Sequence, residues 1–314
     1  MKYTKPYLPV SNQIRLLADR GMDVGDAALA ERVLVQIGYY RLSAYWYPFR
    51  RIEGHARTDN FRDGAKLQDA VSLYIFDKKL RLHVLDAIER IEIGLRTAIA
   101  LQIGKFGAWA HRDVTYVHGK FSRRTNRHGN THFREWMNHL DRCEERSRDE
   151  FVLHYRGKYT SERFLPLWIS VEVWELGLLS HFLAGIRHAD MSTVGLAHGL
   201  TDPHLLPSWT RTLTFVRNVC AHHGRLWNRA MVDQPRFPRT GDMPDFEHVA
   251  LHRPAQERLY GTLVILAYLV KRLNPDTAWP TRVKTLLESF PQTALVDLSS
   301  AGFPENWKDA AVWN

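Results

Sequence analysis

Apolar residues recur at helical spacing along most of the chain. The clearest stretch covers residues 66–104, which contain no proline and, before the last position, a single glycine, Gly94. Leucine, isoleucine and phenylalanine return there every three or four positions, as they do on the buried face of an amphipathic helix. The pattern predicts one long helix, or two nearly collinear helices.

Shorter helices follow from the same spacing and from the positions of proline and glycine. We expect them over residues 11–19, 26–36, 131–151, 166–183, 191–199, 254–273 and 282–290, and from residue 207 to residue 224 or 229. Asp202 and Pro203 have the residue types of a helix N-cap and first turn. In the segment 166–183, Trp168 is expected to be buried with its apolar neighbours. Strand-like alternation is weak throughout, so the expected fold class is all-α.

The chain is expected to divide into three segments. These are an N-terminal accessory segment at 1–62, a helical domain at 63–275 with a basic loop at 112–134, and a C-terminal helix and tail at 276–314. The accessory segment includes GYYRLSAYWYPFR, residues 38–50. This run is either a packed aromatic cluster that docks the segment or, beside Arg41, Arg50 and Arg51, a surface on which bases stack.

Composition and charge narrow the possible functions. The chain has 314 residues, a net charge of +9 and two cysteines, which exclude a disulfide scaffold and a four-cysteine zinc site. The start lacks the apolar core of a signal peptide, and no apolar run approaches the roughly 20 residues of a membrane span. We therefore expect a soluble, cytoplasmic protein with an anionic partner, nucleic acid first and a membrane surface second.

Positive charge concentrates between Asp113 and Glu135, where the chain has no acidic residue. This basic loop is either a solvated charged loop or an arm that contacts a phosphate backbone, adding affinity rather than sequence preference. Side chains expected to contact RNA are those of Lys120, Arg123, Arg124, Arg127, Arg225, Arg229 and Arg41.

An arginine and a histidine five positions apart, Arg217 and His222, give the sharpest candidate site. Five such pairs occur in the chain, so the spacing alone carries little weight. Only this pair lies inside a strong helical pattern, with Asn218 and His222 one turn apart on a polar face. Arg225 and Arg229 are expected to continue that face. Arg217 lies one step round the helix, so a symmetric partner helix would complete the site.

These residue types suit RNA cleavage without a metal. A histidine, whose pKa is about 6.5 in model peptides, can take the proton of a 2′-hydroxyl or give one to the leaving oxygen. An arginine stabilises the extra negative charge of the transition state. The products would be a 2′,3′-cyclic phosphate and a 5′-hydroxyl. The alternative is a structural helix whose polar face is merely solvated or ion-paired.

Glu89, Glu92 and Arg96 share one face of the long predicted helix. They are either a surface Glu92–Arg96 pair at i, i+4 spacing or a glutamate that orients Arg217 or His222 from a facing helix. We expect these three residues, together with His223, to support the site formed by Arg217 and His222.

Other chemistries find little support in the sequence. Cys220, His222 and His223 do not have the spacing of a zinc site, and no second cluster completes four ligands, so no metal is expected. There is no nucleophile elbow of a serine hydrolase and no phosphate-binding glycine loop, and no cofactor is expected.

Three stretches resemble the Abi-type abortive-infection proteins of bacteria, the AbiD/AbiF-like group. They are KPYLPVSNQIRLLADRG, IGYYRLSAYWYPFR and RNVCAHHGRLWNR, in that order, and the resemblance covers roughly residues 5 to 275. The third is similar to the HEPN ribonuclease motif: Arg217 matches its arginine, Asn218 the frequent polar residue after it, and His222 its histidine. The resemblance implies a helical HEPN-like bundle that dimerises and places two motifs around a shared cleft.

The resulting hypothesis is a metal-independent endoribonuclease of phage defence, with toxin–antitoxin character. It would act as a homodimer on RNA and could also hold a regulatory non-coding RNA. The alternative is a non-catalytic RNA-binding or RNA-regulated helical dimer that serves as a regulator or scaffold. The two differ in His222, whose removal should abolish cleavage in the first case and matter little in the second. A protein–protein interaction module would leave the charge of the basic loop without a purpose.

Overall fold

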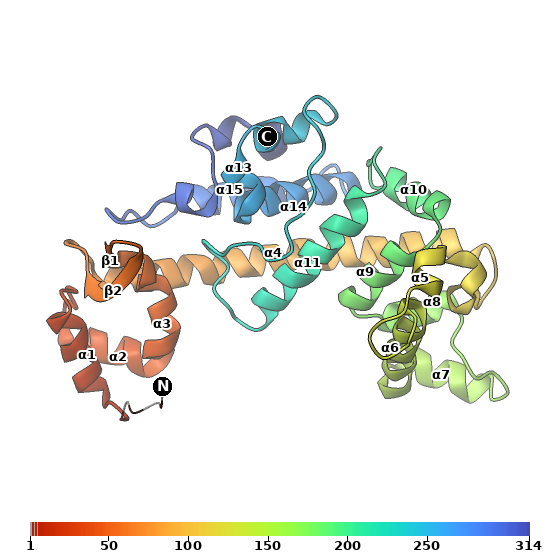
Figure 1. Cartoon of the computed structure of the whole chain (residues 1–314), viewed down its shortest axis with the longest axis horizontal. Coiled ribbons are helices and arrows are strands. Elements are labelled where there is room, and N and C mark those ends of the chain that lie inside the picture. Colours follow the sequence, from red (N-terminus) through yellow and green to blue (C-terminus); the bar gives the residue numbers. More distant parts are fainter. Residues whose placement is uncertain (1, 3, 5) are drawn as a thin grey trace.

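One long helix organises the molecule. In the computed structural model, which describes residues 2, 4 and 6–314, α4 (Leu67–Gly104) runs along the longest axis (Figure 1). Residues 1, 3 and 5, which begin the expected accessory segment, lie outside the described residues. The helix spans 38 residues, or about 57 Å at a rise of about 1.5 Å per residue. The prediction of a long helix over 66–104 is confirmed, as a single helix.

The other elements are short and mostly helical. The remaining α-helices of the described chain are α1 (Val10–Asp19), α2 (Ala27–Ile37), α3 (Tyr39–Trp46), α5 (Gly119–Arg123), α6 (His132–Arg146), α7 (Glu150–Lys158), α8 (Leu167–Ser170), α9 (Leu176–Gly185), α10 (His188–Ala197), α11 (Leu205–Ala221), α12 (Glu247–Ala250), α13 (Arg253–Glu257), α14 (Leu259–Leu273) and α15 (Trp279–Glu288). Strands β1 (Arg50–Glu53) and β2 (Ala56–Phe61) form one antiparallel pair with Ile52 opposite Arg57. The all-α prediction is confirmed, and no helix of the described residues is long and apolar enough to cross a membrane.

The helices gather at three places along α4 (Figure 1). Helices α1 to α3 and the β1–β2 pair form an N-terminal lobe at one end, and α5 to α9 form a second group, the basic lobe, at the other end. Helices α13 to α15 lie along the middle of α4, and α11 crosses α4 between the two lobes. Large buried side chains on α4, such as Phe76, Leu80 and Leu95, join these groups into one core.

The aromatic run at 38–50 is a docking element. Tyr45, Trp46 and Phe49 are buried in the core that the N-terminal lobe shares with α4. The packed-cluster interpretation is therefore confirmed for these three side chains. Tyr40 and Tyr47 of the same run are exposed, and base stacking on them stays a prediction.

Three predicted helices are each interrupted in the structure. The helix expected at 131–151 ends at Arg146 and restarts at Glu150, because the Ser147 hydroxyl hydrogen-bonds to the Asp149 carboxylate, 2.6 Å away, within an extended turn. The helix expected at 254–273 breaks at Arg258, whose guanidinium donates to Asn228 and to the Ser300 carbonyl. In both places side-chain hydrogen bonds compete with the helical pattern.

The helix expected at 166–183 is the third. It separates into α8, a 3-10 turn and α9, with Trp174 and Glu175 extended between them. The Trp174 indole is buried and donates to the Ser170 hydroxyl (3.0 Å). The break rotates the short α8, so the expectation that Trp168 is buried is wrong: its side chain is 53% exposed.

A buried histidine should make the fold acid-sensitive. His111 is fully buried, and neither ring nitrogen has a hydrogen-bond partner among the described residues. Burial, followed by the neighbouring charge of Arg112, lowers the pKa of His111 to about 3. The imidazole is therefore neutral in the folded protein and takes up its proton on unfolding below about pH 6.5.

Proton uptake by His111 on unfolding sets the direction and the size of the change in stability with pH. The unfolded chain binds the extra proton, so the stability due to the neutral ring is complete above about pH 6.5 and is lost progressively as the pH falls towards 3. At pH 5 the loss is about 2 kcal/mol. Between pH 7.5 and 5, the free energy of unfolding measured with urea should therefore fall less for His111→Leu than for the wild type, by this amount. Equal falls in the variant and the wild type would contradict the assignment.

Candidate functional site

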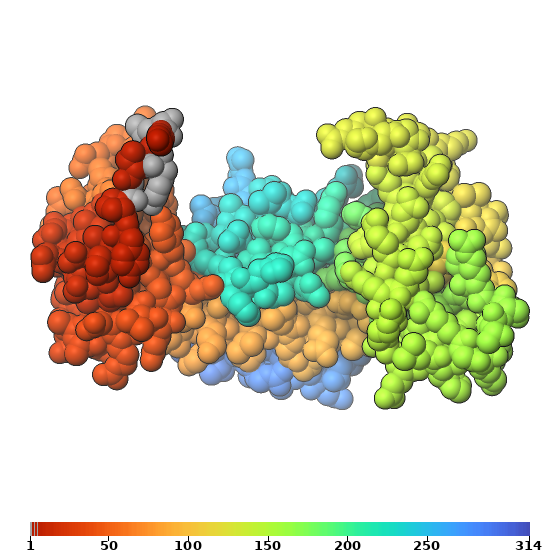
Figure 2. Space-filling model, turned by 90° about the horizontal axis from the view of Figure 1, so that it is seen from below, coloured from red at the N-terminus to blue at the C-terminus, as the bar shows by residue number. Residues whose placement is uncertain are grey.

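Helix α11 presents the arginine–histidine motif on an exposed face. Its apolar side, with Leu213, Val216 and Cys220, is buried in the core. Arg217 and Asn218 on the other side are exposed, and the Arg217 guanidinium donates to the Asn218 side-chain oxygen (3.2 Å). Figure 2 shows α11 and its following turn, in teal, on a face flanked by the N-terminal lobe and the basic lobe, which project beyond it.

The helix ends earlier than predicted. Ala221 is its last residue and His222 is the C-cap, with the His222 N–H donating to the Asn218 carbonyl (3.0 Å). Asn218 and His222 thus remain one turn apart on one face, as expected. The predicted extension to 224 or 229 is wrong, because His223 takes the left-handed conformation (φ +56°). Arg225 and Arg229 therefore do not continue the polar face of the helix.

His223 closes a Schellman turn in a place usually held by glycine. The Gly224 N–H donates to the Val219 carbonyl (2.8 Å) and the His223 N–H to the Cys220 carbonyl (3.0 Å). A left-handed conformation costs a side-chain-bearing residue roughly 1–2 kcal/mol. His223 was expected to support the site; in the structure its main chain ends the helix and its side chain is exposed.

We expect His223→Gly to stabilise the protein by about 0.5–1 kcal/mol, because glycine adopts this conformation without strain while gaining some entropy in the unfolded chain. The midpoint of urea unfolding measures the change. The same variant tests the supporting role, since loss of activity in a more stable protein would assign a function to the imidazole. A lower midpoint would contradict the strain argument.

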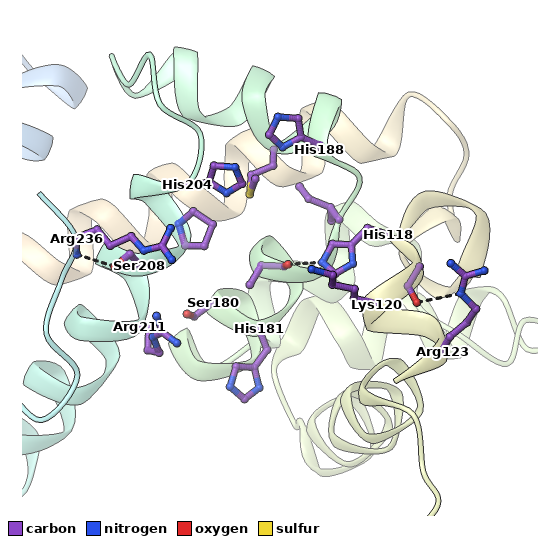
Figure 3. Close-up of a pocket in the computed structure, with 15 residues that line it drawn as sticks. His118, Lys120, Arg123, Ser180, His181, His188, His204, Ser208, Arg211 and Arg236 are labelled. Atoms are coloured by element: carbon purple, nitrogen blue, oxygen red, sulfur yellow. Dashed lines mark hydrogen bonds between the residues drawn. The ribbon is translucent and has the colours of Figure 1, made fainter. Parts of the chain in front are cut away.

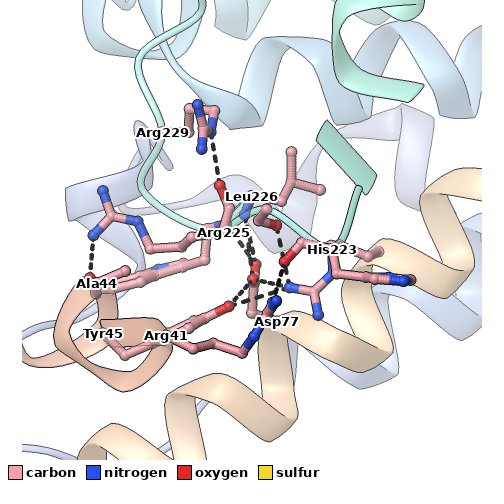
Figure 4. A network of polar contacts seen from close by, with 11 residues as sticks. Arg41, Ala44, Tyr45, Asp77, His223, Arg225, Leu226 and Arg229 are labelled. Atoms are coloured by element: carbon pink, nitrogen blue, oxygen red, sulfur yellow. Dashed lines mark hydrogen bonds and ion pairs between the residues drawn. The ribbon is translucent and has the colours of Figure 1, made fainter. Parts of the chain in front are cut away.

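A buried carboxylate holds the turn that follows His222. Asp77 of α4 is fully buried and accepts hydrogen bonds from the Tyr45 hydroxyl (2.7 Å) and the Trp227 N–H (2.6 Å), and it pairs with Arg81 (Figure 4). Burial and the Asp77 carboxylate raise the pKa of Tyr45, so its hydroxyl remains a donor. Asp77 was not singled out in the sequence, yet it joins α3, α4 and the end of the motif.

Three arginines expected to contact RNA also hold this turn together (Figure 4). Arg41 of α3 donates to the His223 carbonyl (2.8 Å), and Arg225 donates to the Ala44 carbonyl. Arg229 donates to the carbonyl of Arg225 (2.7 Å). Their guanidinium groups thus already serve the fold. RNA binding by the remaining donors of these groups stays a prediction.

The supporting pair on α4 is half-buried rather than on the open surface. Glu92 and Arg96 are 2.6 Å apart and only 16% and 19% exposed, and Arg96 also donates to the Trp174 carbonyl (2.6 Å). Burial raises the pKa of Glu92, while the positive charges of Arg96 and Arg217 lower it. The expected i, i+4 pair of Glu92 and Arg96 is therefore confirmed, although it is half-buried rather than on the open surface. The charge of Arg217 acts on Glu92, and a role of Glu92 in orienting Arg217 stays a prediction. Glu89 is exposed one turn away.

A second acidic neighbour of Arg217 was missed. The hydrogen bond from Arg146 lowers the pKa of Glu175 by more than partial burial raises it. The positive charge of Arg217 also lowers this pKa. Glu175 immediately precedes α9. It was missed because the prediction placed it in the middle of one continuous helix at 166–183. An acidic residue directly before an apolar helical run is the signal that could have found it.

Glu175 also belongs to the one group of potential metal ligands found among the described residues. Ligand atoms of His139, Cys143 and Glu175 all lie within 4.8 Å of one another. Arg146 hydrogen-bonds to the Glu175 carboxylate and lies 3.6 Å from the Cys143 sulfur. A metal ion would have to displace this guanidinium, so the donor set does not fit a resident metal, and the absence of a metal stays a prediction.

The basic loop is partly ordered by helix and turn rather than being an open loop. Lys120 and Arg123 lie on α5, a short helix that was not predicted within the loop, and Arg124 is its C-cap. Arg127 lies in the turn closed by the Thr125–Thr131 bridge. All four side chains are exposed. Lys120 and Arg123 line a cavity of about 660 Å³ (Figure 3).

Comparison with known proteins identifies a family. The family model described as "Abi-like protein" matches residues 32–228, which include α4, the basic lobe, the motif of α11 and the turn held by Asp77. No curated protein and no solved structure matches the chain. Since the matched segment covers well over half of the sequence, the chain belongs to the Abi-like protein family.

Proposed function

We propose that the protein is a metal-independent endoribonuclease acting in abortive infection, the phage-defence role that its family membership suggests. The observation that carries the proposal is the exposed group of Arg217, Asn218 and His222 at one end of α11. A buried network behind this group fixes the turn after His222, as a site that must hold its geometry requires.

The proposed reaction uses the RNA as its own nucleophile. A His222 imidazole takes the proton of the 2′-hydroxyl, the 2′-oxygen attacks the adjacent phosphorus, and the bond to the 5′-oxygen breaks. A protonated imidazole gives its proton to that leaving oxygen. Arg217 stabilises the charge that develops on the phosphoryl oxygens, and Asn218 orients its guanidinium. The negative charges of Glu92 and Glu175 attract the Arg217 guanidinium.

Base and acid act on opposite sides of the phosphorus, while each chain has one histidine at this position. We therefore include a homodimer in the proposal, in which two copies contribute one His222 each to a shared cleft. Leu82 and Ile93 of α4 are 60% and 53% exposed, and exposed apolar side chains suit a contact with a second copy. Light scattering should give twice the chain mass; a cleaving monomer would contradict the shared cleft.

The second candidate function is a non-catalytic RNA-binding or RNA-regulated dimer acting as a regulator or scaffold. The exposed positive charge of Lys120, Arg123, Arg124 and Arg127 favours it, because this charge suits a bound RNA whether or not that RNA is cut. A regulatory non-coding RNA would occupy the same surface.

An RNA with one altered sugar tests the proposed chemistry. Once a cleavage position is known, the same strand carrying a 2′-deoxy sugar at that position should remain intact there, because the attacking oxygen is missing. Cleavage at neighbouring positions is the internal control. Cutting at the deoxy position would show that water or a protein group attacks instead.

A further inference from the structure

The cavity beside the basic lobe is a separate feature of the same face. It has a volume of about 660 Å³ and lies between α5, α9, α10 and the first turns of α11 (Figure 3). This volume is within the range of sites that hold small molecules or parts of larger ligands. Arg211 and Arg236 stand on one side, with His118 and Lys120 on the other.

The lining of the cavity holds basic side chains and no acidic one. Four of its fifteen lining residues are lysine or arginine and four are histidine, whereas none is acidic. No ion pair within the described part of the chain involves Lys120, Arg211 or Arg236. The nearby carboxylate of Asp190, next to the lining residue Met191, is engaged by Arg187 (2.8 Å) and Gln102 (2.7 Å). The positive charge of these three side chains therefore has no acidic partner among the residues that the structure describes.

The walls of the cavity are held in place by hydrogen bonds. The His118 ring accepts from the Phe121 N–H at Nδ1 (3.1 Å), and its Nε2 lies 2.9 Å from the Ala184 carbonyl, which it can donate to. This joins α5 to α9. On the other side, the Ser208 hydroxyl accepts from the Arg236 N–H (2.8 Å), which fixes the segment after α11.

Burial and nearby positive groups act together on His181, a histidine that lines the cavity. The pKa of His181 lies below its usual range, first because its imidazole is desolvated and then because His139, His132 and Arg211 are near. Fixed positive groups without counter-charges attract anions, and the attraction is strongest where the surface is concave. An anion that pairs with Arg211 would relieve this repulsion.

The cavity is aligned with the arginine–histidine motif. Arg211 and Asn218 are seven residues apart on α11, which places them on the same face, about 10 Å apart along the axis. A nucleic-acid strand that crosses the motif therefore has its next phosphate groups within reach of Arg211.

We propose that this cavity binds a phosphate-bearing nucleotide of the RNA strand, next to the nucleotide held at Arg217 and His222. The assignment rests on the proposed function, because it takes the strand at the motif as given. It adds Arg211 and Arg236 to the RNA-binding residues. The same chemistry would also accept a free nucleotide, and the experiment below separates the two sources.

The test measures binding, not cleavage, on the full-length protein. Fluorescence anisotropy of a labelled single-stranded RNA, made non-cleavable by 2′-deoxy sugars, is compared for the wild type, Arg211→Gln and Arg236→Gln. Arg32→Gln is the matched control, since Arg32 is an exposed arginine of α2 in the distant N-terminal lobe. We expect each cavity variant to weaken binding about tenfold and to lower the salt slope by about one, with the control within about twofold.

Competition with ATP and with AMP supplies the second arm. If Arg211→Gln removes ATP or AMP binding but leaves RNA binding unchanged, the cavity belongs to a free nucleotide and the RNA assignment fails. If neither ligand is affected, the cavity proposal fails altogether. Weakened RNA binding in a protein that proves unable to cut RNA would support the cavity and remove only the proposed catalysis.

Discussion

Replacing His222 with alanine is expected to lower cleavage of single-stranded RNA at least about 100-fold, since general acid–base catalysis contributes about 10²- to 10⁴-fold. RNA affinity should stay within about threefold, because phosphate contacts from basic side chains supply most of it. His222 is exposed at the C-cap, so its removal leaves no cavity in the core. Single-turnover cleavage and anisotropy on the same RNA measure the two effects separately.

Arg217→Ala should lower the rate of RNA cleavage about 100- to 1,000-fold, which is the range for removing one group that stabilises a developing charge. The matched control for His222→Ala is His128→Ala, because Arg123 and His128 have the same spacing as Arg217 and His222 but lie in the basic loop. This control should cut RNA at the wild-type rate. If His128→Ala and His222→Ala are equally active, the motif on α11 is not the active site.

Asp77→Ala should destabilise the fold by about 3–5 kcal/mol, the range for breaking one side of a buried ion pair. The change leaves the Arg81 guanidinium buried without its carboxylate and the Trp227 N–H without its acceptor. Urea unfolding measures the loss. Asp77→Asn keeps an acceptor for the Trp227 N–H but removes the charge, so it should lose less stability than Asp77→Ala.

The same variant should disturb the site. Asp77 binds the main chain five residues after His222, so its removal frees the turn that places the imidazole. Cleavage by the fraction that remains folded should fall as well. A stable Asp77→Ala protein with wild-type cleavage would show that the network neither supports the fold nor positions the motif.

Long, regular elements could be predicted from the sequence because their pattern is local. The periodicity of residues 67–104 is uninterrupted, and α4 follows it to the last turn. The breaks at Ser147, Trp174 and Arg258 could not be predicted in this way, because each depends on a hydrogen bond or on burial of a side chain. The end of α11 was misjudged because His223, rather than glycine, takes the left-handed position.

The motif itself could be found from residue types and helical context, whereas its surroundings could not. Asp77 and Arg81 are one turn apart on α4 and would fit an ordinary helix-surface ion pair. The role of Asp77 becomes visible only when residues 226 and 227 fold back onto it. Arg211 and Arg236 join Lys120 across more than 90 residues of sequence. Sequence spacing holds no information on such distant neighbours.

The most direct test of the account is cleavage of labelled single-stranded RNA in EDTA by the wild type and by His222→Ala, with analysis of the new 3′ ends. We expect cleavage by the wild type alone, with 2′,3′-cyclic phosphate ends. Cleavage that requires a divalent metal and leaves 3′-hydroxyl ends would contradict it, as would equal cleavage by both proteins.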